Sequence, residues 1–137
     1  MGERIRYLRR RLRINYAAAA AGAGVSPNTL LRLERGEGRP QDWTISRLLR
    51  YLGRALKEVF PGAEDVYDLI IPPKDFGSWL RNLRLRRGLQ QKELAEILGL
   101  SKVSVCRYEK NIVKPQEAIL KRLRRRFSLN GEFERYI

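Results

Sequence analysis

The chain has 137 residues, 43% of them apolar, and carries 29 Lys or Arg against 15 Asp or Glu with no histidine. This composition is typical of a folded protein and excludes extensive disorder, while the length allows one ordinary domain or two small ones. The formal charge of +14 predicts attraction to a polyanion, either a nucleic-acid backbone or an anionic lipid surface.

Short helices are predicted along residues 1–60. The pattern favours one helix over 5–13 and a second over 17–23, with Gly24 in the turn that follows. Ser26 is a good N-cap and Pro27 suits the first helical position, so a third helix should run from there to residue 35. A fourth helix over 43–51 and a fifth over 54–60 complete an all-α unit.

Residues 61–76 form a predicted connector with prolines at both ends. Its net charge is −3, between +8 for residues 1–60 and +9 for residues 77–137. The segment 66–71 is too apolar for a purely flexible tether. We therefore expect the connector to be extended and packed against one lobe or against a second subunit.

Residues 77–137 repeat the helical plan. A first helix ends at Gly88, a second covers 91–98, and Ser101 caps a third that runs to about residue 109. Pro115 is predicted to open a fourth helix, with an apolar stripe that contains Ile119, Leu120 and Leu123.

The two basic lobes align with each other at an offset of 75 residues without a gap. Ser26 falls on Ser101 and Gly24 falls on Gly99. Further identical pairs at this offset are Arg6 and Arg81, Leu8 and Leu83, Arg9 and Arg84, Ala20 and Ala95, Arg32 and Arg107, Glu34 and Glu109, and Pro40 and Pro115. A long repeat present only twice indicates domain duplication.

Both lobes resemble the lambda-repressor/Cro-like helix-turn-helix family, also called the xenobiotic-response-element type. The second lobe matches in Leu80, Leu83, Arg84, Gly88, Leu89, Gln91, Leu94, Ala95, Gly99, Leu100, Ser101, Arg107, Tyr108, Glu109 and Pro115. The first matches in Ile5, Arg9, Ala20, Gly24, Val25, Ser26, Leu33, Glu34, Gly36 and Pro40, then in Leu52, Gly53, Leu56, Val59 and Phe60. The resemblance implies two tandem four- to five-helix DNA-binding domains, at 1–60 and 77–137, joined by a short extended linker.

The resemblance makes the third helix of each lobe the recognition helix, which enters the major groove and contacts base edges. The expected base contacts are Lys102, Val103, Ser104 and Arg107 in the second lobe, and Asn28, Thr29 and Arg32 in the first. The expected phosphate contacts are Gln91, Asn111, Lys114, Arg35 and Arg39. By the same resemblance, Arg9 with Glu34 and Arg84 with Glu109 form structural ion pairs, and the opposite helix faces, with Leu30, Leu33, Val105 and Tyr108, belong to the core.

The first lobe departs from the family in its second helix, where residues 17–23 are alanines and one glycine. The family usually has a bulky apolar residue at the place of Ala19 and a Gln at the place of Tyr16. Loss of a core leucine without compensation costs roughly 2–5 kcal/mol. The first lobe must therefore pack this helix closer, gain support from a neighbour, or be the weaker domain.

These features favour a transcriptional regulator, with a repressor as the favoured role, that binds double-stranded DNA in the cytoplasm at the nucleoid. With one cysteine and no Cys/His cluster, neither metal nor cofactor is expected, and no catalytic motif suggests an enzyme. No membrane partner is expected either, because the chain has no apolar stretch of spanning length and no signal-peptide run.

Three alternatives stay open from the sequence. The chain could be an adaptor that docks on RNA polymerase or another regulator, with the first lobe used for protein contacts or dimerisation. It could form a homodimer through the connector. It could also coat nucleic acid non-specifically, which would require only charge.

Overall fold

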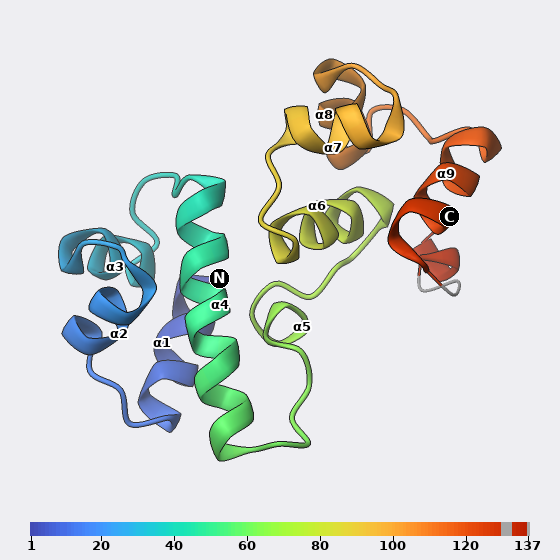
Figure 1. The fold of residues 1–137 in the computed structure, drawn as a ribbon. Coiled ribbons are helices and arrows are strands. Elements are labelled where there is room, and N and C mark those ends of the chain that lie inside the picture. The colour runs from blue at the N-terminus through green and yellow to red at the C-terminus, as the bar shows by residue number, and fades with distance from the viewer. Residues whose placement is uncertain (130–132, 137) are drawn as a thin grey trace. The chain divides into compact units, whose positions relative to one another are not determined.

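A computed structural model describes residues 1–129 and 133–136 (Figure 1). Over these residues the secondary structure consists of nine α-helices and one 3₁₀ helix, without strands, so the predicted all-α class is confirmed. The chain divides into two units, Met1–Pro72 and Pro73–Ile137. None of the helices in the described ranges combines the length and the apolar character that crossing a bilayer requires.

Unit 1 contains five helices. They are α1 (Gly2–Arg11), α2 (Tyr16–Ala23), α3 (Pro27–Glu34), α4 (Asp42–Val59) and α5 (Val66–Ile70). Local signals fix the starts of α2 and α3, because Asn15 Oδ1 accepts from the Ala18 amide at 2.8 Å and Ser26 Oγ accepts from the Thr29 amide at 3.1 Å. Gly24, at φ 74°, ends α2 in the left-handed conformation that glycine adopts without strain.

The predicted break near residue 53 is wrong, because α4 is one continuous helix of 18 residues. Gly53 lies where α5 approaches, and a Cβ there would stand 3.1 Å from Val66 Cγ1.

The connector is also not extended throughout, since α5 forms within it, with Val66, Tyr67 and Ile70 buried. This short helix packs against α4 and α1, so the segment through Pro72 belongs to unit 1 (Figure 1).

The alanine-rich helix α2 compensates for its small side chains by close packing on α4. Ala19 and Ala20 are fully buried. Gly22 contacts the ring of Tyr51 so closely that any Cβ at this position would overlap it. Of the three outcomes expected for this helix, the structure shows closer packing.

Unit 2 contains α6 (Phe76–Arg86), α7 (Gln91–Leu98), α8 (Lys102–Glu109), α9 (Glu117–Phe127) and η1 (Glu134–Tyr136). The helix α9 starts two residues later than Pro115 predicted, with Gln116 as its N-cap. The core is formed by Phe76, Trp79, Leu80, Leu83, Leu94, Ala95, Leu98, Val105, Tyr108, Leu120, Leu123, Phe127 and Phe133.

The duplication is visible in helix bounds as well as in sequence. Both α2 with α7 and α3 with α8 begin and end 75 residues apart, and α4 and α9 begin 75 residues apart. The correspondence extends to the turn after the first helix of each unit, where Arg13 has φ 57° and Gly88 has φ 67°. Arg13 therefore lies in the left-handed region, which is unfavourable for residues that have a Cβ.

Candidate nucleic-acid interface

The helices α3 and α8, predicted to be the recognition helices, each have one buried face and one exposed face. Leu30 and Leu33 are 1% and 4% exposed, and Val105 and Tyr108 are 0% and 9% exposed, as predicted for core residues. The opposite faces carry the residues predicted to contact bases. Each helix is thus supported by its own domain on one side and free to meet a ligand on the other.

In α8 the exposed face begins at Lys102 and continues through Arg107. Val103 is 56% exposed, which leaves an apolar side chain in solvent. Ser104 is half-buried, with its amide 3.2 Å and its hydroxyl 3.1 Å from the hydroxyl of the cap residue Ser101. Cys106, also half-buried, lies between the exposed and the buried face.

In α3 Asn28 and Arg32 are exposed, and Thr29 repeats the arrangement of Ser104. The hydroxyl of Thr29 lies 2.7 Å from that of Ser26. Arg32 makes a loose, exposed ion pair with Glu37, with Nε and Oε2 4.0 Å apart. A pair of this kind contributes little to stability, so Arg32 can exchange it for another anion at little cost.

The five predicted phosphate contacts divide into two groups. Lys114, Arg35 and Arg39 are exposed. Gln91 donates from Nε2 to Glu109 Oε1 at 3.2 Å. Asn111 accepts from the amide of Gly77 at 2.9 Å and also hydrogen-bonds the carboxylate of Asp75. These two side chains therefore have partners within the fold, and they remain predicted phosphate contacts.

The two predicted ion pairs join the first and third helices of each unit. Arg84 donates from Nε and Nη2 to the two carboxylate oxygens of Glu109 at 2.7 and 3.0 Å, and from Nη1 to the Leu89 carbonyl at 3.0 Å. Arg9 makes the same three contacts with Glu34 and with Ile14, at 2.8, 2.8 and 2.9 Å. The Glu34 carboxylate raises the pKa of Arg9 above its ordinary value. Each bidentate pair anchors the C-terminal end of α3 or α8 to the first helix of its unit.

Two further pairs of residues, which contact α3 and α8 or the turns before them, were not identified from the sequence. Gly2 lies against the backbone carbonyls of Leu33 and Glu34, and Gly77 lies against those of Tyr108 and Glu109, where a Cβ would overlap them. Arg47 and Arg122 donate to the turns before α3 and α8. Both pairs are identical residues at the offset of 75, so the repeat alone could have indicated them.

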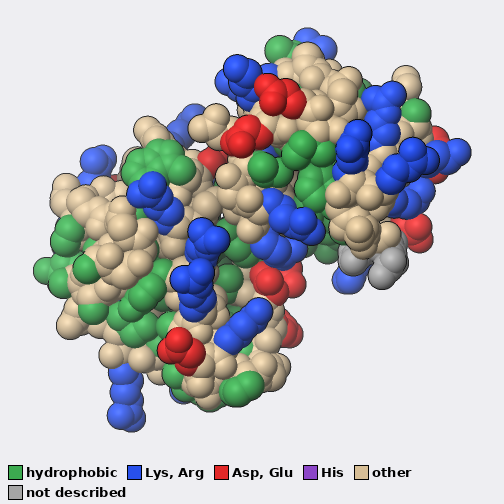
Figure 2. Space-filling view, viewed as in Figure 1, with side chains coloured by type: hydrophobic (Ala, Val, Ile, Leu, Met, Phe, Trp, Pro, Cys, Tyr) green, Lys and Arg blue, Asp and Glu red, His purple; other side chains and the backbone are tan. Residues whose placement is uncertain are grey.

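Charge around these helices is predominantly positive. On the face shown in Figure 2, Lys and Arg side chains occur over both units, and fewer Asp and Glu side chains are seen on that face. Over the described residues no cluster of Cys, Asp and Glu could hold a metal ion. The exposed side chains predicted to contact bases on α3 and α8 are three cations, one amide and one apolar group. They are Arg32, Lys102, Arg107, Asn28 and Val103.

Comparison with protein families gives two matches. Residues 1–59 match a family described as a helix-turn-helix domain, and residues 80–131 match a second family described as helix-turn-helix. Neither the curated proteins nor the solved structures contain a match to this chain. The two matches together span most of the sequence and confirm the predicted tandem arrangement. The chain belongs to the helix-turn-helix proteins and carries two domains of this class in tandem, the second of the Cro type, which is the organisation of a DNA-binding regulator.

Proposed function

We propose that this protein is a sequence-specific regulator of transcription, acting as a repressor at the chromosomal DNA, that inserts α3 and α8 into the major groove. The observation that carries the proposal is the exposed first turn and outer face of each helix, opposite a buried apolar face. A protruding helix of this kind fits the major groove, where each base pair presents its own pattern of donors, acceptors and methyl groups.

The proposed base contacts follow from side-chain chemistry. Arg107 and Arg32 suit the O6 and N7 acceptors of guanine, Asn28 suits adenine, and Val103 suits the thymine methyl group. Lys102, Ser104 and Thr29 complete the base-facing set, and Lys114, Arg35 and Arg39 hold phosphates. Asn28 and Val103 occupy equivalent positions, and so do Pro27 and Lys102. The two helices therefore present different surfaces and favour an asymmetric site.

A selection from randomised duplex DNA at physiological salt tests this function. With the enriched duplex, Arg107→Ala should lose about 1–3 kcal/mol of binding free energy and relax preference at one base pair, because a base contact is removed. Lys114→Ala should weaken binding to the enriched and to random duplexes equally, because a phosphate contact carries no sequence information. Equal losses on both duplexes for both variants would contradict base recognition.

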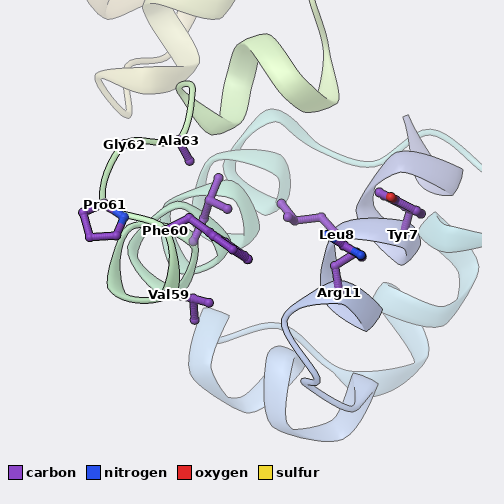
Figure 3. A pocket seen from close by; sticks show the side chains of 9 residues that line it. Tyr7, Leu8, Arg11, Val59, Phe60, Pro61, Gly62 and Ala63 are labelled. Atoms are coloured by element: carbon purple, nitrogen blue, oxygen red, sulfur yellow. The ribbon is translucent and has the colours of Figure 1, made fainter.

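A second candidate function is a protein-binding adaptor, for RNA polymerase or another regulator, and one feature of unit 1 favours it. An open hollow of about 650 Å³ lies between α1 and the end of α4 (Figure 3). Its lining includes Tyr7, Val59 and Phe60, which are 66%, 55% and 46% exposed. An adaptor predicts that no selected sequence binds better than random DNA, and that Phe60→Asp abolishes binding of a co-purified partner.

A further inference from the structure

We propose that Arg47 and Arg122, which we name the turn arginines, are positioning residues that fix the angle between the second and third helices of each domain. They would thereby orient the recognition helix toward the bases. This inference rests on the proposed function. It goes beyond that function because it places a determinant of sequence preference on α4 and α9 rather than on the recognition helices.

The turn arginines occupy equivalent places in both units. Arg122 on α9 donates from Nη1 to the carbonyl of Leu98, the last residue of α7, at 3.0 Å. Arg47 on α4 donates from Nη1 to the carbonyl of Gly24, which directly follows α2, at 3.3 Å. The fourth helix of each unit is thus bonded to the turn that determines where the recognition helix begins.

The turn itself explains why such a bond matters. The carbonyls at the C-terminus of a helix have no partner within it and carry partial negative charge, which suits a guanidinium. In unit 2 the Gly99 and Leu100 amides donate to the Glu96 and Ala95 carbonyls at 3.3 and 2.8 Å, and Arg122 supplies the donor for Leu98. Between the two helices stands Gly99 at φ 68°, and a Cβ there would lie 3.1 Å from Arg122 Nη1.

The two turn arginines are held differently. Arg47 lies over the ring of Trp43, with 4.9 Å between the guanidinium carbon and the ring centroid. The residue of unit 2 equivalent to Trp43 is Ala118, which has no ring for Arg122 to lie over. Arg122 instead makes the shorter of the two hydrogen bonds, to Leu98. Contact with a carbonyl of the turn is therefore retained in both units although the surroundings of the arginine differ, which supports a role tied to the turn.

Both turn arginines are exposed, so each could instead act only as a positive charge near DNA. The chain offers a matched control for this alternative. Arg50 and Arg125 are also exposed, lie on the same two helices three residues further on, and are also separated by 75 residues. Replacing any of these four arginines by alanine removes the same charge, but only two of the replacements remove a bond to the turn.

The experiment compares the full-length variants Arg47→Ala, Arg50→Ala, Arg122→Ala and Arg125→Ala on the duplex enriched by the wild-type protein and on a scrambled duplex. The readout is the discrimination ratio, the Kd on the scrambled duplex divided by the Kd on the enriched one, at physiological salt. Arg122→Ala and Arg47→Ala should lower this ratio about tenfold, the value of one hydrogen bond. The two control variants should weaken binding to both duplexes and leave the ratio unchanged. Arg122→Lys, which keeps one donor and the charge, should restore most of the ratio.

Each outcome decides the proposal. Equal ratios for turn and control variants overturn it, even when Arg122→Ala lowers the Tm, because a purely stabilising residue would not change discrimination. A reduced ratio in only one unit assigns the role to that arginine and removes it from the other. Should Arg122→Ala not fold, Arg122→Met retains the packing of the aliphatic stem and takes its place. Failure of the selection to enrich any sequence overturns the proposed function and this proposal together, whereas an enriched sequence with equal ratios overturns this proposal alone.

Discussion

Two arginine–glutamate pairs of unit 2 differ in burial, and their expected contributions to stability differ accordingly. Arg84 and Glu109 expose 1% and 4% of their side chains, and their hydrogen-bonding groups point at one another. Arg124 and Glu117 expose 32% and 64% and approach only to 3.3 Å. A buried pair that loses one partner leaves an uncompensated charge, whereas an exposed pair is already solvated.

This contrast predicts the effect of removing each carboxylate. Glu109→Ala should lower the free energy of unfolding of unit 2 by about 3–5 kcal/mol, and Glu117→Ala by less than about 1 kcal/mol. Urea unfolding measured through Trp79 fluorescence in a Trp43→Phe background would report unit 2 alone. Similar losses for both variants would contradict the interpretation of Arg84 and Glu109 as a buried structural pair.

At the scale of helices, α2 and α7 show the same fold built with different side-chain volumes. At the place of the buried Leu94 in α7, α2 has the fully buried Ala19. The volume is recovered by α4, which contacts α2 closely enough that Tyr51 touches Gly22. The small residues of α2 therefore match a close contact between the two helices.

Reciprocal substitutions test this account of the two helices. Leu94→Ala should destabilise unit 2 by about 2–5 kcal/mol, because a cavity opens in the core. Ala19→Leu should not stabilise unit 1 but destabilise it by about 1–3 kcal/mol, because the space is already filled. Thermal unfolding of both variants measures this, and a higher Tm for Ala19→Leu would show that unit 1 is underpacked.

The start of α6 predicts a dependence on pH. Asp75 Oδ1 accepts from the Ser78 amide at 2.8 Å, and this hydrogen bond in particular lowers the pKa of Asp75 below its ordinary value of 3.8. A lowered folded-state pKa gives stability that is fully present above pH 3.8 and is lost as the pH falls through the folded value. Asp75→Ala should therefore cost about 1 kcal/mol at neutral pH. The difference from the wild type should shrink below pH 3.8, which unfolding of unit 2 across this range would measure.

The predictability of these helices from sequence depended on how local their signals are. Caps such as Ser26 and Ser101 and the turn glycines are local, and they placed α3 and α8 to within a residue. The helix α4 continues through Gly53, which lies against Val66 of α5, a contact that a local rule for glycine does not include, and that rule gave a false break. The hydrogen bonds from Gly77 to Asn111 and from Gln91 to Glu109 could not be predicted from local sequence, because these partners become neighbours only on folding.

For the whole molecule, net charge should govern affinity and leave sequence preference largely unchanged. With a formal charge of +14, binding should release many counterions from DNA, and six to ten phosphate contacts would imply a loss of about 10³–10⁵ in affinity between 50 and 200 mM salt. Because this contribution is independent of sequence, the enriched and the scrambled duplex should weaken in parallel. Titrations across this salt range would test it, and a preference that vanished at 200 mM would contradict readout by base contacts.

The half-buried Cys106 on α8 has a practical consequence for such measurements, since it is the sole cysteine of the chain and lies next to Arg107. A thiol-directed reagent would therefore modify the protein at a single known position on a recognition helix. DNA seated over α8 should slow this alkylation, while DNA held only through distant basic side chains should leave its rate unchanged. The protein thus contains an intrinsic chemical reporter that distinguishes the two binding modes without any engineered label.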